Sequence, residues 1–201
     1  HGDYGGWYPP ASQSRAELRL ELGIRHDEVV LLAFGQIRGY KRLLELARAV
    51  VAAQSDHPEI RLLVAGAPTE VAVAADLADL AANSERVIVL SERVSDARVS
   101  DLYELADLAV LNYAEVFSSG ALLLALTQGV AVVSLRSGAV EEVASWPAIA
   151  VADSTSALLD QAIELAKVLP AVRVDAARRA AAAADWTVTA EALLAAYRFD
   201  R

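Results

Sequence analysis

The chain has 201 residues, 55% of them hydrophobic, and a formal net charge of −9, which excludes a disordered chain and argues against broad nucleic-acid binding. No apolar run reaches the roughly 18 residues of a membrane span, and no basic segment followed by an apolar one marks a secretory signal. Cysteine is absent and His1, His26 and His57 lie far apart in the sequence, so thiolate chemistry is excluded and no metal site is expected.

The predicted elements alternate along the chain. Residues 1–13 show no periodicity and predict a loop and hinge region that leads into the domain. Ser14-Arg-Ala-Glu17 is a capping-box pattern that opens a short helix ending at Gly23. The strand and helix pairs that follow are Val29–Phe34 with Lys41–Gln54, Ile60–Ala65 with Thr69–Ala82, Val87–Leu90 with Asp96–Leu105, Leu108–Leu111 with Gly120–Gln128, Val130–Leu135 with Val140–Ala144, and Ile149–Val151 with Ser156–Leu169.

Short apolar runs without polar alternation are typical of strands buried on both faces, and helices between them indicate βαβ units. We therefore predict an α/β fold, a doubly wound, parallel, six-stranded Rossmann-like sheet in the order 3-2-1-4-5-6. Two more helices are predicted at Ala171–Ala184 and Thr187–Tyr197. Residues 1–201 are expected to form a single domain, with 14–170 as its core and 171–201 as C-terminal helices.

The loop after the first predicted strand carries the first candidate site. It reads Gly35-Gln36-Ile37-Arg38-Gly39-Tyr40-Lys41 and places two cations at the start of a predicted helix. A helix N-terminus already attracts anions, so cations there oppose the helix dipole and suggest an anionic ligand. The alternative is an ordinary loop whose cations are solvated.

The loop after the fourth predicted strand carries the second candidate site, Phe117-Ser118-Ser119-Gly120. Hydroxyl groups and a glycine at a helix N-terminus form an anion-binding surface, although plain N-capping explains the serines equally well. In the predicted order the first and fourth strands are neighbours at the switch point, outside whose carboxyl ends ligands bind. We predict that a diphosphate lies there between Gly35, Arg38 and Lys41 on one side and Ser118, Ser119 and Gly120 on the other.

At these residues the chain resembles the C-terminal, donor-binding domain of a GT-B glycosyltransferase of the group 1 (GT4-like) family. The resemblance covers nearly the whole chain, and the motifs occur in the family's order and spacing. Residues 34–41 are similar to its Gly-Arg-x-x-x-x-Lys segment, 106–111 to its "ADLVVLPS" strand, 119–133 to its glycine and "EAMACGLPVV" block, and 138–143 to its "GGxPEVV" turn, while Trp186 and Tyr197 suit its closing helix.

The resemblance implies a retaining transfer of sugar from a nucleoside-diphosphate donor, UDP or GDP, to a glycan or glycoconjugate acceptor. It implies that Lys41 grips the diphosphate and that no metal or other cofactor is needed. It also implies that the loop Glu92, Arg93 and Val94 lies against the base. Gln36 stands in place of the family's arginine, for which Arg38 is a candidate substitute.

The family's paired glutamates are replaced by Val116 and Leu124, which leaves ribose recognition open. Glu115, adjacent to the first of them, and Glu142 are candidates for base and ribose binding. The alternative interpretation of both is a solvated carboxylate. The catalytic residues are not identified by the sequence.

The acceptor-binding N-terminal domain of the family has no counterpart in this chain, which also lacks methionine. We therefore expect a part of a longer, cytoplasmic enzyme that attaches to membranes, if at all, through that other domain. The expected partners are the nucleotide sugar and that domain, with no nucleic acid and no direct membrane insertion. Alone, the chain is expected to bind donor weakly and transfer nothing. A nucleotide-sugar 2-epimerase-like domain and a non-catalytic α/β interaction module are the alternatives.

Overall fold

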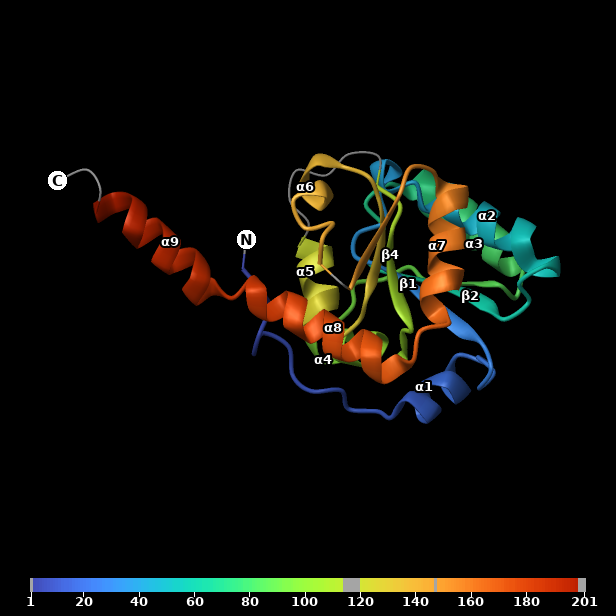
Figure 1. The fold of residues 1–201 in the computed structure, drawn as a ribbon. Helices are drawn as coiled ribbons and strands as arrows, with labels where there is room; N and C mark the ends of the chain where they lie inside the picture. Colours follow the sequence, from blue (N-terminus) through green and yellow to red (C-terminus); the bar gives the residue numbers. More distant parts are fainter. Residues whose placement is uncertain (1, 114–119, 147, 199–201) are drawn as a thin grey trace.

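The computed structural model describes residues 2–113, 120–146 and 148–198 (Figure 1). Its six-stranded sheet has the order β3-β2-β1-β4-β5-β6, and each neighbouring pair is parallel. The predicted fold class and strand order are therefore confirmed. The strands are β1 Val29–Phe34, β2 Ile60–Ala65, β3 Val87–Leu90, β4 Leu108–Leu111, β5 Val132–Leu135 and β6 Ile149–Ala152.

The register of the central strands brings their carboxyl ends to one edge of the sheet. β1 pairs with β2 from Val29 opposite Ile60 to Phe34 opposite Ala65, and β4 lies on the other side of β1. The aliphatic side chains of these strands are nearly all buried, and each buried large one contributes roughly 1.5–3 kcal/mol. Because both faces are covered, the strands read as continuous apolar runs in the sequence.

Helices cover both faces of the sheet (Figure 1). α2, α3 and α7 pack on one face, while α4 and α5 pack on the other, with α1 against α4 and α8 against α5. The bounds are α1 Arg15–Glu21, α2 Leu43–Ala52, α3 Val71–Ala82, α4 Asp96–Leu105, α5 Gly120–Thr127, α6 Gly138–Glu141, α7 Thr155–Ala166, α8 Pro170–Ala183 and α9 Trp186–Arg198, with 3-10 turns at Gly39–Lys41 and Ala53–Ser55.

Two predicted bounds are corrected by the way helices end. The fifth strand begins at Val132 and not at Val130, because the N–H of Val130 bonds to the carbonyl of Ala125 and closes α5. Gly129 between them has a φ of +78°, the left-handed conformation of a helix C-cap. α7 ends at Ala166 and not at Leu169 because Pro170 already starts the next helix.

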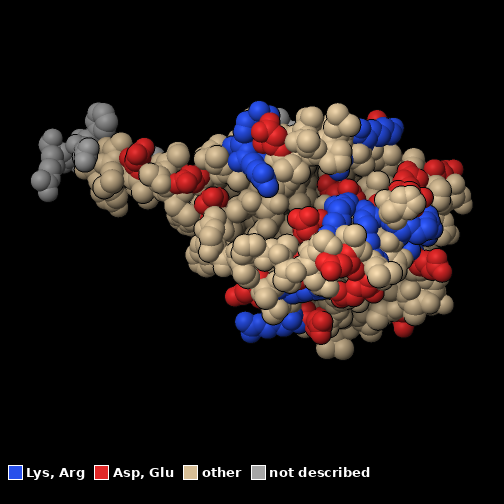
Figure 2. Space-filling model, turned by 90° about the horizontal axis from the view of Figure 1, so that it is seen from below, with Lys and Arg blue, Asp and Glu red and all other residues tan. Residues whose placement is uncertain are grey.

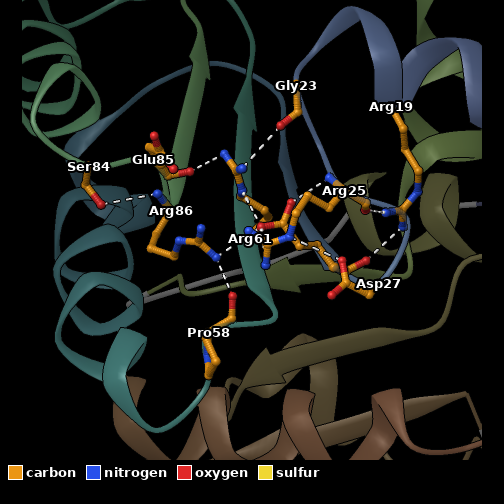
Figure 3. Close-up of polar contacts among 10 residues, drawn as sticks. Arg19, Gly23, Arg25, Asp27, Pro58, Arg61, Ser84, Glu85 and Arg86 are labelled. Atoms are coloured by element: carbon orange, nitrogen blue, oxygen red, sulfur yellow. Dashed lines mark hydrogen bonds and ion pairs between the residues drawn. The ribbon is translucent and has the colours of Figure 1, made fainter.

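A buried ionic network holds the amino ends of β1 and β2 together (Figure 3). Glu28, which precedes β1, has a fully buried side chain and forms ion pairs with Arg61 at 3.2 Å, Arg86 at 3.1 Å and Arg25 at 3.3 Å. Figure 3 labels these three arginines. Burial disfavours its charge, but the N–H of Arg25 and the guanidinium of Arg61 outweigh this, so the pKa of Glu28 is lowered. A buried carboxylate is stable only when it is paired in this way.

A second carboxylate, Asp107, anchors the amino end of β4. It accepts a hydrogen bond from the N–H of Val30 at 2.9 Å and pairs with Arg15, Arg19 and Arg173 at 2.7, 3.3 and 3.5 Å. Figure 2 shows the molecule from below, where basic and acidic side chains lie intermingled and form no patch of one sign.

The N-terminal segment runs across the body from the junction of α8 and α9 to α4. The N–H of Asp3 donates to Ala184 O at 3.0 Å, and Nε1 of Trp186 donates to Asp3 O at 3.0 Å. Further along, the N–H groups of Ser12 and Gln13 donate to the buried carboxylate of Asp101. Beyond the junction α9 projects away from the sheet and its helices (Figures 1 and 2).

Candidate functional site

The loops that follow β1 and β4 leave the sheet side by side, because the two strands are neighbours. Gly35 to Arg42 form the first loop, Asn112 and Tyr113 begin the second, and α5 starts at Gly120. The predicted adjacency at the switch point is thus confirmed. Three candidate residues of the second loop, Glu115, Ser118 and Ser119, lie outside the described residues.

The backbone of the first loop depends on two glycines, Gly35 and Gly66. Gly35 has a φ of +105°, and a Cβ there would lie 2.9 Å from Nζ of Lys41. Gly66, directly after β2, has a φ of +155°, and a Cβ there would lie 2.2 Å from the carbonyl oxygen of Gly35. Both positions require glycine. Gly35 was predicted from the sequence as a site residue and Gly66 was not, although each directly follows a strand.

Lys41 is a buried cation at this edge of the sheet. Its residue surface is 6% exposed, and its Nζ donates to the carbonyl of Phe34 at 3.4 Å. Nζ also lies 5.2 Å from the ring centre of Tyr113. Burial, with repulsion from Arg38, lowers the pKa of Lys41 to about 8. No carboxylate forms an ion pair with it among residues 2–113, 120–146 and 148–198, so its charge has no counter-ion there.

The start of α2 differs from the prediction and changes the role of Lys41. The helix begins at Leu43, after a 3-10 turn at Gly39–Lys41 and after Arg42 in the left-handed conformation with φ +49°. Nδ2 of Asn112 donates to the carbonyl of Arg42 at 3.0 Å and holds this bend. Lys41 therefore lies outside the helix, and the cost of its charge comes from burial and not from the helix dipole on which the sequence-based argument relied.

A buried polar network ties the site to three elements. Asn112 has no exposed surface, and its Oδ1 accepts from the hydroxyl of Thr155, at the start of α7, at 3.0 Å. The same hydroxyl contacts the carboxylate of Glu45, which pairs with Arg42 at 2.6 Å. β4, α2 and α7 are thus joined beside Lys41. Sequence reasoning missed Asn112 and Thr155, because their partners are distant in the chain.

Arg38, the second predicted cation, lies on the same loop and is exposed. Its Nε donates to the hydroxyl of Thr69 at 3.2 Å, which joins it to the loop after β2. The neighbouring N–H of Gly39 donates to Glu70 at 3.0 Å. Arg38 forms no ion pair within the part of the chain that the structure describes, so its guanidinium is available to an anion beside Lys41.

The predicted base and ribose residues lie along the same edge but further from the centre. Glu92, Arg93 and Val94 follow β3, which is separated from β1 by β2; the first two are exposed and Val94 packs on the core. Glu142 follows α6, beyond β5, and is exposed. Within the described residues no hydrogen bond or ion pair joins any of these four to Arg38 or Lys41.

The described residues contain no group of three or more histidine, aspartate or glutamate side chains that could hold a metal ion. None of their helices combines the length and apolar character that crossing a membrane requires.

A six-stranded parallel sheet in the order β3-β2-β1-β4-β5-β6 with helices on both faces is the fold of a Rossmann-like domain of GT-B glycosyltransferases. The chain belongs to the group 1 glycosyl transferases, whose family model matches residues 14–178. The family predicted from the sequence is therefore confirmed. No curated protein matches the chain in sequence.

Solved structures resemble the chain in fold at low identity. HepE from Anabaena, in complex with UDP, has a TM-score of 0.72 and 17% identity over 93% of this chain and 52% of its own. WaaG, a glycosyltransferase of lipopolysaccharide biosynthesis, has a TM-score of 0.63 and 22% identity over 89% and 51%. The C-terminal domain of LpcC from Francisella tularensis has a TM-score of 0.64 and 18% identity over 90% and 95%. The chain thus spans about half of the first two and nearly all of the third.

Proposed function

We propose that this chain is the donor-binding domain of a glycosyltransferase and binds a nucleoside-diphosphate sugar at the carboxyl ends of β1 and β4. The observation that carries the proposal is Lys41, a buried cation that lacks a carboxylate partner among the described residues. Such a charge costs folding free energy, and an anionic ligand would restore the balance. In a member of the group 1 family, the anion expected there is the donor diphosphate.

Each loop has a role in this proposal. Lys41 and Arg38 contact the diphosphate from the side of β1, and Gly35 lets the backbone approach it. Gly120, with Ser118 and Ser119, offers N–H and hydroxyl groups from the side of β4. Protein cations and N–H groups stabilise the charge of the leaving nucleoside diphosphate, so transfer needs no metal.

UDP is the nucleotide we favour, because the HepE structure that this fold resembles holds UDP. We assign base contacts to Glu92, Arg93 and Val94, whose loop lies at the same edge as Lys41. We assign ribose contacts to Glu115 or Glu142, in place of the glutamates that the family carries elsewhere. The expected reaction is retaining transfer to a glycan or glycoconjugate.

A second domain would supply the acceptor site. The chain spans about half the length of HepE and WaaG. The projecting helix α9 has five large apolar side chains that are 50–79% exposed, namely Trp186, Val188, Leu193, Leu194 and Tyr197. Such a group of exposed apolar side chains is unusual on a surface that faces only solvent. We propose that the second domain covers this helix and that the chain alone transfers no sugar. Turnover by the isolated chain in a transferase assay would contradict this.

Thermal unfolding in the presence of UDP, GDP, ADP or TDP, without metal, tests donor binding. A ligand at 100 times its dissociation constant adds about 2.7 kcal/mol of stability, which raises the transition temperature of a chain of this size by roughly 5–11 °C. We expect one diphosphate to raise the transition temperature and Lys41→Met to abolish the effect. Lys167→Met is the matched control, because Lys167 is exposed and pairs only with Glu164 among the described residues. An equal shift in both variants, or none in the wild type, would refute the proposal.

A further inference from the structure

The ammonium group of Lys41 is held by an aromatic ring where a buried lysine ordinarily has a carboxylate. Its Nζ lies 5.2 Å from the ring centre of Tyr113, within the range of roughly 6 Å for a cation–π contact. Among the described residues, the ammonium also contacts the neutral carbonyl of Phe34. Neither contact cancels the positive charge.

Within residues 2–113, 120–146 and 148–198, the charged groups near Lys41 do not neutralise it either. Arg38 on its own loop repels it. Glu70 of the neighbouring loop accepts from the N–H of Gly39, and Glu45 of α2 is paired with Arg42 and bonded to Thr155. These two carboxylates are thus engaged elsewhere.

Tyr113 is placed by its surroundings and not by its hydroxyl group. The residue is 6% exposed, and its ring meets that of Tyr40 edge to face at 5.7 Å and 68°. Its buried hydroxyl has no hydrogen-bond partner in the described part of the chain. Burial, with the charge of Tyr40, raises the pKa of Tyr113 far above its usual value, so the phenol stays neutral. The ring face is therefore what this position contributes.

We propose that Tyr113 is a positioning residue, whose ring holds the ammonium of Lys41 at the carboxyl ends of β1 and β4 and leaves its charge to a diphosphate. A carboxylate at this place would hold the lysine equally well but would cancel the charge that the ligand needs. The inference rests on the proposed function, since it names the residue that prepares the same site. It concerns a contact that can be measured without any ligand.

The pKa of Lys41 reports the contact directly. The sequence contains only two lysines, Lys41 and the exposed Lys167, so carbon-13 NMR of the lysine side chains resolves both, with Lys167 as internal reference. We expect Tyr113→Leu to lower the pKa of Lys41 from about 8 by about one pH unit, because the charged form loses its ring contact. Tyr113→Phe, which keeps the ring, should leave it unchanged.

Two further variants separate positioning from packing. Trifluorophenylalanine at position 113 keeps the shape of the ring but weakens the negative charge on its face. The pKa of Lys41 should therefore be lower in this variant than in Tyr113→Phe. Tyr103→Leu removes another buried tyrosine, which packs on the ring of Phe34 and not on Lys41. This control should reduce stability without moving the pKa of Lys41.

UDP binding by calorimetry at pH 6 and pH 8 completes the test. With a Lys41 pKa lowered by one unit, the protonated fraction at pH 8 falls about fivefold, while at pH 6 it hardly changes. We therefore expect Tyr113→Leu to bind UDP about fivefold more weakly at pH 8 and nearly normally at pH 6. An unchanged pKa in the leucine and fluorinated variants would overturn the inference. If the pKa follows the ring but the wild type does not bind UDP, the positioning contact stands and the proposed function fails.

Discussion

At the scale of single residues, the buried charge of Lys41 lowers the stability of the folded chain. In the unfolded chain a lysine titrates near 10.4, whereas burial lowers the pKa of Lys41 to about 8 in the folded chain. Between these values the unfolded chain binds more protons, so the contribution of Lys41 to stability rises with pH across that window. Below pH 8 the full cost of the buried charge is present.

Replacing Lys41 with an uncharged residue should therefore stabilise the folded chain while abolishing the proposed binding of a diphosphate. We expect Lys41→Met to raise the free energy of unfolding by about 1–3 kcal/mol at pH 7, with the gain shrinking as pH rises from 8 towards 10.5. Urea denaturation at several pH values measures it. A variant that is less stable than the wild type at pH 7 would show that other contacts of Lys41 outweigh its desolvation.

Gly66 offers a second test at this scale. A Cβ at this position would lie 2.2 Å from the carbonyl oxygen of Gly35, and its φ of +155° disfavours any side chain. Gly66→Ala should cost about 3 kcal/mol or more, because backbone must move. The matched control is Gly23→Ala, where φ is +63° but nothing lies within 4 Å of the added carbon. Gly23→Ala should cost only about 1–2 kcal/mol. An equal loss of stability in both variants would show that an added Cβ at position 66 does not clash with the backbone of Gly35.

At the scale of elements, charge pairs at the amino ends of the strands and a polar network at their carboxyl ends set the geometry of the sheet. Glu28 and Asp107 bind arginines from several elements at the amino end. Asn112 connects β4 to the start of α2 and, through Thr155, to α7 at the other end. The loops that carry the candidate site are thus supported by elements that are themselves joined by hydrogen bonds and ion pairs.

Removing the charge of Glu28 tests the network at the amino end. Glu28→Gln leaves the buried Arg61 and the half-buried Arg86 without this counter-ion and should cost about 3–5 kcal/mol at pH 7. The folded pKa of Glu28 is lowered, so its contribution is present above the unfolded value near 4.3 and is lost as pH falls through the folded value. The difference between the variant and the wild type should therefore shrink in acid.

The control for this prediction is the exposed neighbour Asp27, which pairs with Arg25 at the surface. Asp27→Asn should leave the denaturation midpoint unchanged, because exposed pairs contribute little. Equal effects of the two substitutions would mean that Arg61 and Arg86 do not depend on the buried carboxylate.

At the scale of the whole molecule, the chain buries one extended core and leaves α9 largely uncovered (Figure 1). The N-terminal segment contacts the start of this helix through Asp3 and Trp186. The apolar side chains further along it are exposed. Exposed patches of this kind associate with other apolar surfaces.

We expect the isolated chain to self-associate through α9 at high concentration. Leu193→Glu combined with Leu194→Glu should suppress this association in sedimentation experiments, and the response to UDP should persist. Val71→Glu is the control, since Val71 is a large apolar residue on α3 that is exposed by itself. A monomeric wild type, or association that survives the double substitution, would argue against α9 as the contact surface.

The sequence by itself determined the sheet, its strand order, the family and the edge that carries the candidate site. Apolar runs, helical stretches and glycines after strands are local patterns, and parallel strands bring the loops after β1 and β4 together without further information. Gly35, Arg38 and Lys41 were found in this way. The positions of Glu92, Arg93, Val94 and Glu142 at the same edge also follow from the strand order.

Only the tertiary structure decided what surrounds Lys41. Tyr113 lies 72 residues further along the chain, Asn112 bends the start of α2 from 70 residues away, and Gly66 meets Gly35 across neighbouring strands. A local sequence pattern does not reveal contacts between residues that are distant in the chain. The free energy of a charge depends on what is packed against it, so whether this lysine is solvated, neutralised or left for a ligand is settled by folding.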